Sequence, residues 1–519
     1  MLLIAVLILS FCGCSKDMGE NRVMRYDVNH KTPDIDPQFS VSDTAKKIIA
    51  NTFEGLFRYN TEGEIENLLA ESYKVSPDKK IYTFKIKENV KWSNGEPLTA
   101  YDFEYAFKRM FNLQALSPYA VNYTSIKNAD KILNGECKNN MLGVSCPDKY
   151  TLKIELENPN PYFITLLTHN ASMPCNEKFL KESKGRYGLD KEHIIFNGPY
   201  AVKVWTDEEI RIRRNSEYYN KENVICAGVN FYIGRENPSE LFLKNKTDCC
   251  FINESEIEQA KEDKKNIIKF ENTNLELVFN QNTKIFSNDK IRKAFAYSVD
   301  INAFSGDEFF SVEKNIIPDI INTPIGIYRD IVGDVDYTAR TSSNPKKLLS
   351  EGMEELGIRK LGKITILLPD NSAGKKTVLE LQKVWAKNIS VYVNFEFMPE
   401  ADLIKRIKKS DYQIALVPSR PKDDSAISIL SSYTSENENN YSGFKNKEFD
   451  KLIYDSMHNE NIKESLNQIK KAEQYLIDEA VVVPIFSSNQ FFAMNKDVSD
   501  IDVSVYEGTC FFKNARRID

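Results

Sequence analysis

The sequence predicts a large α/β protein with more than one domain, for three reasons. Its 519 residues correspond to about three domains of ordinary size. Hydrophobic residues make up 41% of the chain and charged residues 28%, so a large core can form and a disordered chain is excluded. From Lys363 onward, short apolar segments alternate with amphipathic ones, which is typical of a layered α/β structure with parallel strands.

The charge pattern excludes two classes of protein. Lys and Arg number 69 and Asp and Glu number 75, which gives a net charge of −6, and both signs are spread along the chain. A protein that binds duplex nucleic acid usually carries a concentrated basic face, so no nucleic-acid partner is expected. No apolar run inside the chain approaches the roughly 20 residues that cross a bilayer, which excludes a multi-span membrane protein.

The N-terminal segment 1–13 is apolar and indicates export. It is short for a membrane span, and polar residues follow it from Ser15. Its end, Phe11-Cys12-Gly13-Cys14, resembles a bacterial lipobox, in which the last Cys becomes the mature N-terminus and carries lipid. We therefore expect residues 1–19 to be a lipoprotein signal peptide and linker, with lipid on Cys14. Because no Lys or Arg precedes the apolar run, a translation start upstream is expected; the alternative is a buried N-terminal helix.

In the first half of the chain, alternating apolar residues predict strands at 81–86, 150–156 and 275–279. Thr99 and Asp102 have the spacing of a capping box, which predicts a helix that continues through Phe111. A second helix is expected to follow Ser287, because apolar residues recur at helical spacing up to Val299.

In the second half, strands and helices alternate. The predicted strands are 364–368, 391–397 and 412–417, and helices run between them through Leu381 and through Leu403. A polar connector at 431–447 leads to helices near 446–457 and 460–480, and a last apolar strand follows at 480–486. Strands separated by helices of this length favour parallel pairing.

The cysteines leave two alternatives open. Seven follow Cys14, and an odd number leaves at least one thiol unpaired. Cys137 and Cys146 bracket a short loop and form either a local disulfide, if the site of export is oxidising, or two free thiols. No Cys-x-x-Cys pair occurs and the four histidines are isolated in sequence, so neither a metal site nor any cofactor is predicted.

The sequence lacks the familiar motifs of catalysis. The segment 371–377 looks like a phosphate-binding loop, but Pro369 stands where the leading glycine is needed and the residue after Lys375 is another lysine. No Gly-x-Ser-x-Gly or His-Glu-x-x-His motif occurs. Asp423 and Asp424 are adjacent acids in a polar loop, which are usually solvated. The sequence therefore favours a binding protein over an enzyme, and a hydrolase is the weaker hypothesis.

Several blocks of residues resemble the family 5 extracellular solute-binding proteins, and their oligopeptide-binding branch most of all. The blocks occur in the order of that family: Phe53-Glu54-Gly55-Leu56, residues 82–103, Asn197-Gly198-Pro199-Tyr200, Ile291-Arg292-Lys293-Ala294-Phe295, residues 344–349 and Phe449-Asp450. The resemblance extends from about Asp27 to Phe486, which is nearly the whole mature chain.

The resemblance implies an α/β fold of the periplasmic-binding-protein type: two lobes with a hinge between them, in the large type II subclass with an extra inserted domain. Lobe 1 would comprise residues 20–43, 170–271 and 487–519, the inserted domain 44–169, and lobe 2 272–486. The chain would cross between the lobes near Asn272–Leu275 and near Phe486–Asn489.

The resemblance also implies a function. The protein would be the solute-binding component of an ABC importer, capture oligopeptides between its lobes by closure of the hinge, and deliver them to membrane permease subunits driven by separate ATPase subunits. It would be an exported monomer without a cofactor, lipid-anchored to the outer face of the cell membrane or periplasmic. The alternative is the same fold binding a specific signal peptide or a non-peptide solute such as a sugar or a metal chelate.

Two positions depart from the oligopeptide-binding pattern. Relatives of that branch place an acid in a Trp-x-x-Asp-Tyr loop to pair with the α-amino group of the ligand, and here Lys422 stands at that position in the 419–425 loop. Lys31, next to Thr32, likewise replaces an acid near the N-terminus. Basic side chains would repel an ammonium group. Either Asp423 or Asp424 is its partner, or the ligand is N-blocked, acidic or not a simple peptide.

The candidate ligand-binding residues follow from the resemblance, and each of them has an alternative, purely structural role. They are Lys31, Thr32, Tyr119, Phe279, Asn280, Ser419, Arg420, Lys422, Asp423, Asp424 and Phe486. For the 419–425 loop the alternative is a solvated surface loop, and for Tyr119, Phe279, Asn280 and Phe486 it is packing in the core. No catalytic or metal-binding residue is predicted.

Overall fold

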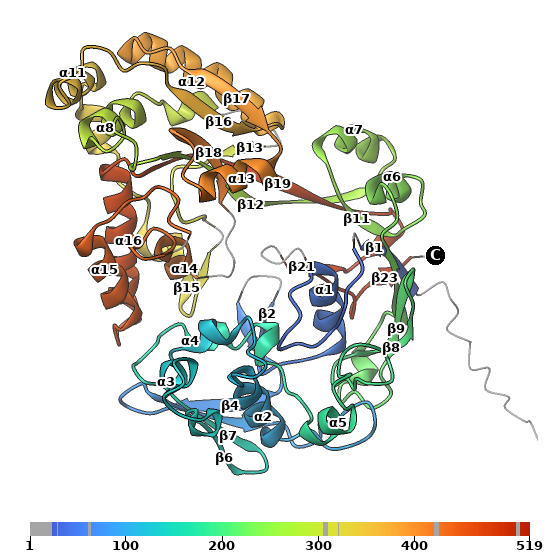
Figure 1. Ribbon diagram of the computed structural model, residues 1–519. Coiled ribbons are helices and arrows are strands. Elements are labelled where there is room, and N and C mark those ends of the chain that lie inside the picture. Colours follow the sequence, from blue (N-terminus) through green and yellow to red (C-terminus); the bar gives the residue numbers. More distant parts are fainter. Residues whose placement is uncertain are drawn as a thin grey trace, which may run out of the picture.

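In the computed structural model, the chain forms two bodies linked by two long strands, β12 (Asn266–Phe279) and β19 (Val482–Met494) (Figure 1). We call the body of N-terminal elements lobe 1 and the body that begins after β12 lobe 2. The structure describes residues 23–518 except for 29, 61–63, 305–309, 320, 420–424, 438 and 505–508. The predicted signal segment and Cys14 lie outside the described residues. Among those that are described, no helix is long and apolar enough to cross a membrane.

Lobe 1 contains a four-stranded sheet in the order β1-β10-β9-β8, in which β1 and β10 are parallel and the other pairs antiparallel. Its strands are β1 (Val23–Val28), β8 (Tyr200–Trp205), β9 (Glu209–Arg214) and β10 (Gly228–Ile233), with β11 (Cys249–Ile252) pairing on β19. Its helices are α1 (Asp43–Thr52), α5 (Glu177–Glu182), α6 (Pro238–Leu243) and α7 (Glu254–Glu262). Two short pairs end the chain: β20 (Val498–Ser499) with β23 (Arg516–Arg517), and β21 (Asp502–Ser504) with β22 (Thr509–Phe511).

A second antiparallel sheet lies on lobe 1, in the order β4-β5-β7-β6. Its strands are β4 (Ala70–Val75), β5 (Ile81–Ile86), β6 (Val144–Asp148) and β7 (Thr151–Glu155), and β2 (Phe57–Tyr59) pairs with β3 (Ile65–Asn67) beside it. The helices are α2 (Ala100–Met110), α3 (Ala129–Leu133) and α4 (Phe163–Leu166). Helix α2 begins with the predicted capping box, because Asp102 accepts a hydrogen bond from the backbone N–H of Thr99 at 2.7 Å.

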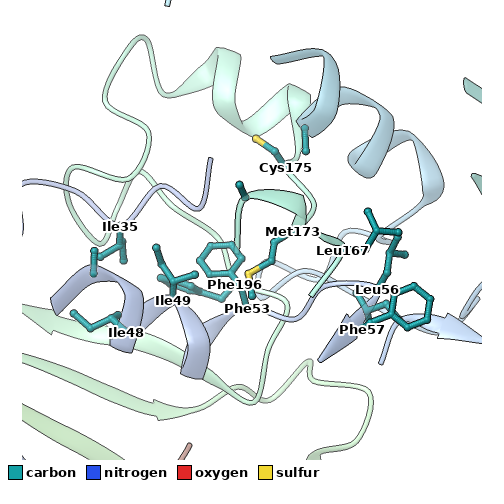
Figure 2. Packing of buried hydrophobic residues seen from close by; sticks show 14 of the residues in the cluster. Ile35, Ile48, Ile49, Phe53, Leu56, Phe57, Leu167, Met173, Cys175 and Phe196 are labelled. Carbon is teal, nitrogen blue, oxygen red and sulfur yellow. The ribbon is translucent and has the colours of Figure 1, made fainter. Parts of the chain in front are cut away.

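These two sheets share one hydrophobic core. Figure 2 shows part of it, where Ile49 and Phe53 of the α1 region lie beside Phe196, and Leu56 lies beside Leu167. The core continues from Met24 of β1 to Phe103 of α2 without a break. The β4–β7 sheet is therefore fused to lobe 1 rather than attached to it by a linker.

Lobe 2 is built on the predicted parallel α/β layer. Its sheet has the order β11-β19-β12-β18-β16-β17, with β13 (Phe310–Val312) pairing on β19. Strand β16 (Thr365–Pro369) is parallel to both β17 (Asn394–Met398) and β18 (Ile414–Ser419), as the alternation of elements predicts. A small hairpin, β14 (Asn322–Thr323) with β15 (Gly326–Ile327), projects from this lobe toward lobe 1 (Figure 1).

Helices cover both faces of the lobe 2 sheet. They are α8 (Asp289–Tyr297), α9 (Tyr328–Val332), α10 (Thr338–Ser342), α11 (Pro345–Glu355), α12 (Ser372–Ile389), α13 (Glu400–Lys408), α14 (Ala426–Ser431), α15 (Lys447–Met457) and α16 (Ile462–Asp478). Leu277 and Phe279 of β12 face a core that includes Trp385 of α12, whereas Val278 faces a core under α14–α16. Adjacent β12 residues thus point to opposite layers, as the pleat of a central strand requires.

The two connecting strands are longer than predicted. The strand expected at 275–279 begins at Asn266, and the strand expected at 480–486 continues to Met494. The extra residues carry the pairing into lobe 1, where Phe270, Phe492 and Met494 join the core of that lobe. The register of the pair shifts between Glu271 and Thr273 and again between Leu275 and Glu276, so regular pairing is interrupted where the strands pass between the lobes.

The seven described cysteines are all free thiols. Cys137 and Cys146 are half-buried, and the structure therefore corresponds to the free-thiol alternative for this pair.

A buried ion pair joins α2 to the N-terminal segment. Arg109 forms two hydrogen bonds to the Asp36 carboxylate, one of them from Nη1 to Oδ1 at 2.9 Å, and a third to Gln38 at 3.0 Å. The guanidinium also lies over the rings of Phe39 and Tyr187. A charged pair that is buried and fully hydrogen-bonded fixes the two segments relative to each other.

Replacing Arg109 with alanine should lower the free energy of unfolding by about 3–5 kcal/mol, because the Asp36 carboxylate would stay buried without its cation. Denaturant unfolding of the purified protein measures this change. Arg186→Ala is the matched control: this exposed arginine pairs with Asp190 four residues further along the chain, and its loss should cost less than about 1 kcal/mol. Similar losses in the two variants would contradict the anchoring role of Arg109.

Candidate functional site

The carboxyl ends of the lobe 2 strands point toward the region between the lobes. Ser419, the last residue of β18, lies opposite Asn274, which is where β12 enters lobe 2. Strands β16 and β17 run in the same direction as β18. In open α/β sheets, ligands bind beyond the carboxyl ends of the parallel strands. The candidate site is therefore the interlobe region beside the crossing of β12 and β19, with one wall from each lobe.

The lobe 1 wall contains three of the predicted residues. Thr32 donates a hydrogen bond to the carbonyl of Asp34 at 2.6 Å, and Ser40 donates to the same carbonyl at 3.2 Å. Tyr119 in turn donates to the carbonyl of Ser40 at 2.6 Å. Lys31 lies at the surface nearby and forms an ion pair with Asp207 at 3.0 Å. Lys31, Thr32 and Tyr119, which are far apart in sequence, thus come together on one lobe.

His169 belongs to this wall and was missed by the sequence analysis. Its ring lies 4.7 Å from the ring of Tyr119, and its Nδ1 accepts a hydrogen bond from the backbone of Ala171 at 3.1 Å. Burial, with a smaller contribution from Lys46, lowers the pKa of His169 to about 4. The ring is therefore neutral at physiological pH and acts as an aromatic and hydrogen-bonding surface. An isolated histidine in a polar segment gives no local signal of this contact.

Lobe 2 contains a buried carboxyl group near Asn274. Glu276 of β12 accepts a hydrogen bond from the hydroxyl of Tyr433 at 2.8 Å. Burial raises the pKa of Glu276 to about 7, an effect that the Tyr433 hydrogen bond opposes and the nearby Glu473 reinforces. Its other carboxylate oxygen has no hydrogen-bond partner among the described residues, and the same is true of Oδ1 of Asn274 two residues earlier. Residues two apart on a strand share a face, so this side of β12 presents two acceptors.

A second buried pair holds the segment that covers these acceptors. Arg329 and Glu473 are joined by two hydrogen bonds, at 2.8 and 3.2 Å, and Glu473 also accepts from the backbone of Ile317 at 2.9 Å. The adjacent carbonyl of Ile316 accepts from Asn274 at 3.3 Å. The ion pair on α9 and α16 therefore fixes a backbone segment against the start of β12 in lobe 2.

Lobe 1 offers a charged pair of its own at the carboxyl ends of β1 and β10. Asp27 accepts a hydrogen bond from Nε of Arg235 at 2.6 Å, and the guanidinium lies 4.1 Å from the ring of Tyr232. The Asp27 side chain is almost completely buried. Sequence reasoning missed this pair because 208 residues separate its members.

Three other predicted residues lie within lobe 2. Phe279 is buried against Phe286, with ring centroids 5.3 Å apart, and Phe486 is buried against Phe310 at 4.9 Å. Asn280 donates to the carbonyls of Ser410 and Tyr412. All three positions thus match the packing alternative of the sequence analysis. Arg420, Lys422, Asp423 and Asp424 lie outside the described residues.

The comparisons with known proteins agree with this arrangement. Residues 64–441 match the profile of the bacterial extracellular solute-binding proteins, family 5. The chain is 28% identical to the dipeptide-binding protein DppE of Bacillus subtilis (94% of this chain, 90% of DppE) and 28% identical to the oligopeptide-binding protein OppA of that organism (99% and 98%). Among solved structures, the unliganded open form of the periplasmic murein tripeptide-binding protein MppA matches with a TM-score of 0.77 at 21% identity (96% and 98%).

The structural match establishes the predicted fold, a two-lobed periplasmic-binding-protein-like architecture of the α/β class. The profile match covers most of the chain. The chain therefore belongs to family 5 of the bacterial extracellular solute-binding proteins, which is a family of solute receptors and not of enzymes.

Proposed function

We propose that this protein is the solute-binding component of an ABC importer and that it captures peptides between its lobes. The observation that carries the proposal is the two-lobed fold, in which β12 and β19 run through both lobes, together with similarity over nearly the full length to a dipeptide-binding and an oligopeptide-binding protein. The protein itself carries out no catalysis and needs no cofactor in this proposal.

The ligand would lie extended between the two walls. Peptides of different sequence share their backbone N–H and C=O groups, so a receptor that pairs with the backbone binds many of them. Ser419 at the end of β18 and the 420–424 segment would supply the lobe 2 side, and Lys31, Thr32 and Tyr119 the lobe 1 side. Closure requires that the ligand contact both lobes, since only differential contacts shift the equilibrium between open and closed forms.

The hinge would lie where the register of β12 and β19 shifts. Bending costs least where the hydrogen-bond ladder is already interrupted. We accordingly propose that lobe 1 consists of 20–43, 170–271 and 487–519 together with its inserted domain, 44–169, and that lobe 2 is 272–486. The change of hydrophobic core between Phe270 and Leu275 supports the first boundary.

Lys31 and Lys422, which replace acids of the oligopeptide-binding pattern, raise the question of which group pairs with the ligand's α-ammonium group. Lys31 pairs with Asp207, so its positive charge is partly offset on its own lobe. We propose that Asp423 or Asp424 meets the α-ammonium group of the peptide in place of the acid that Lys422 replaces.

The proposed cellular arrangement completes the importer. Cys14 would carry the lipid that holds the protein, as a monomer, on the outer face of the cell membrane, near permease subunits and their ATPase subunits. The pattern Phe11-Cys12-Gly13-Cys14 after an apolar run supports the anchor. Tethering raises the effective concentration of the receptor at its permease.

Peptide capture is tested with the purified mature protein. Mass spectrometry of the material released on unfolding should recover peptides, and X-ray scattering should show a smaller radius of gyration after peptides are added. Tyr119→Ala should weaken peptide binding about tenfold because an aromatic contact is lost. Tyr392→Ala, at a tyrosine on lobe 2 that is 77% exposed, is the control and should have no effect.

Titration of the protein with N-acetylated peptides, compared with the same peptides bearing a free α-amino group, tests the ammonium contact. Loss of a charge-assisted hydrogen bond should weaken binding by about 10- to 100-fold. Unchanged affinity would refute the role proposed for Asp423 and Asp424. Recovery of sugars or metal chelates, without peptides, would refute the peptide function itself.

The lipid anchor predicts a simple difference between two variants. Cys14→Ser, expressed in a bacterial host that lipidates exported proteins, should no longer incorporate labelled fatty acid and should leave the membrane fraction. Cys12→Ser should retain both lipid and membrane association. A membrane-bound, unlabelled Cys14→Ser protein would be incompatible with the anchor.

Glu276 makes the stability of lobe 2 depend on pH. Its pKa of about 7 in the folded protein lies above the ordinary value of 4.5, so the folded state holds the proton more tightly than the unfolded state. The contribution of Glu276 to the free energy of unfolding is therefore largest at low pH, and it is lost as the pH rises from 4.5 through 7.

Glu276→Gln should remove this pH dependence, because the amide is uncharged and still accepts the Tyr433 hydrogen bond. Between pH 5 and pH 8 the wild-type protein should lose about 2–3 kcal/mol of unfolding free energy that the variant keeps. Denaturant unfolding at both pH values gives the difference, with Glu464→Gln on the exposed side of α16 as the control. Parallel pH profiles for the wild type and Glu276→Gln would exclude this role.

A further inference from the structure

Tyr162 connects the two lobes at a place that is separate from β12 and β19. It precedes α4, in the part of the chain whose other aromatic residues belong to lobe 1, yet its ring is 6% exposed and is part of the lobe 2 core under α14–α16. Its hydroxyl lies 3.2 Å from Oγ of Ser465 on α16, and Ser465 donates to the carbonyl of Ser456 on α15 at 2.7 Å. The tyrosine is therefore inserted where α15 and α16 meet.

The neighbouring residues hold the other side of this contact firmly. Phe163, the next residue, is fully buried in the lobe 1 core, and its ring lies 4.9 Å from the ring of Tyr82 on β5. The hydroxyl of Tyr82 donates to the carbonyl of Asn160 at 3.2 Å, and the side chain of Asn160 accepts from the backbone of Tyr162 at 2.9 Å. Two consecutive aromatic residues are thus buried in different lobes.

The space beside Tyr162 is open. A cavity of about 610 Å³ lies between the lobes, lined on one side by Pro159, Pro161 and Ile164 and on the other by Glu460, Ile462 and the β14–β15 hairpin. Ile325, at the tip of that hairpin, is 43% exposed. Because the volume beside the buried Tyr162 ring is open, the lobes can rotate about this residue without a steric clash. A continuous packed interface between the lobes would prevent that rotation.

The position of Tyr162 restricts the motion. In Figure 1, α4 and the lower end of α15 lie at the lower left of the interlobe region, whereas β12 and β19 cross above it. Two bodies joined by one flexible connection bend and twist in several directions. Two bodies joined at two separate places rotate about the line that connects those places.

We propose that Tyr162 is a second joint between the lobes, which remains inserted in lobe 2 while the lobes open and close. It is a positioning residue: it contacts no ligand, and it aligns the two walls of the binding site. The proposal deepens the proposed function and rests on it for the effect on peptide affinity, but the joint itself exists without any ligand.

X-ray scattering of the ligand-free, full mature protein tests the joint directly. Tyr162→Ala should increase the radius of gyration and broaden the distance distribution, because the lobes would then lose their contact at α15 and α16. Tyr162→Phe keeps the ring and loses the hydroxyl, and it should restore the wild-type scattering. Tyr454→Ala, at a tyrosine on α15 that is 60% exposed, is the matched control.

Peptide titration supplies the second readout. In Tyr162→Ala, part of the binding free energy is used to order the two lobes, so the dissociation constant for peptides should rise about 5- to 30-fold. For Tyr162→Phe the rise should be less than about 3-fold. If Tyr162→Ala shows no cooperative thermal unfolding, Tyr162→Leu takes its place, because leucine fills only part of the space of the ring and should produce the same changes to a smaller degree.

The outcomes separate the joint from the proposed function. Wild-type scattering and wild-type affinity in a folded Tyr162→Ala protein would overturn the joint, as would a lower dissociation constant, which would mean that the contact must break on closure. Failure of the wild-type protein to bind peptides would overturn the proposed function, while the ligand-free scattering would still decide whether Tyr162 joins the lobes.

Discussion

The structure depends on the continuous pairing of β12 with β19. Each strand is central to the lobe 2 sheet, and each also contributes to the core of lobe 1, through Phe270 on one and Phe492 on the other. Backbone groups buried at the crossing need partners, and the antiparallel ladder supplies them. The same ladder limits how the lobes can separate, because sliding the strands would break its hydrogen bonds, whereas bending at the shifted register breaks few.

Local patterns predicted much of this fold. Strand 81–86 agrees with β5, and the capping box at Thr99 begins α2 where expected. The parallel arrangement of β16 with β17 and β18 also follows from the alternation of elements. Each of these features is encoded within about 20 residues of sequence, by alternation, helical spacing or a cap. Such signals can be recognised without knowing which remote segments pack against the element. The two-lobed architecture needed the resemblance to a family.

Other features could not be predicted because their partners are remote. The lobe 1 halves of β12 and β19 lack clean alternation, because Ile267 and Ile268 are adjacent apolar residues, as are Phe491 and Phe492. Phe491 and Phe492 are buried in two different cores, whereas Ile267 packs against one of these cores and Ile268 is 39% exposed. Glu276 looks like an ordinary strand glutamate until Tyr433, 157 residues away, closes over it. Tyr162 and Phe163 form a short apolar pair that gives no sign of being divided between two bodies.

The charges on the two walls set how the site can respond to a ligand. The Lys31–Asp207 pair is exposed, and such pairs are worth about 0–1 kcal/mol, so Lys31 can exchange Asp207 for a ligand carboxylate at little cost. Glu276 is different, since any new partner must displace Tyr433 or use the carboxylate oxygen that lacks a described partner, inside the protein. A new charge at the surface of lobe 1 can therefore be accommodated by exchanging one ion pair for another. In the described part of lobe 2, a new charge would have to break a buried hydrogen bond or enter the protein interior. In the function proposed above, such a receptor would gain its affinity from backbone contacts and from the alignment of its lobes, and charged termini would adjust its selectivity.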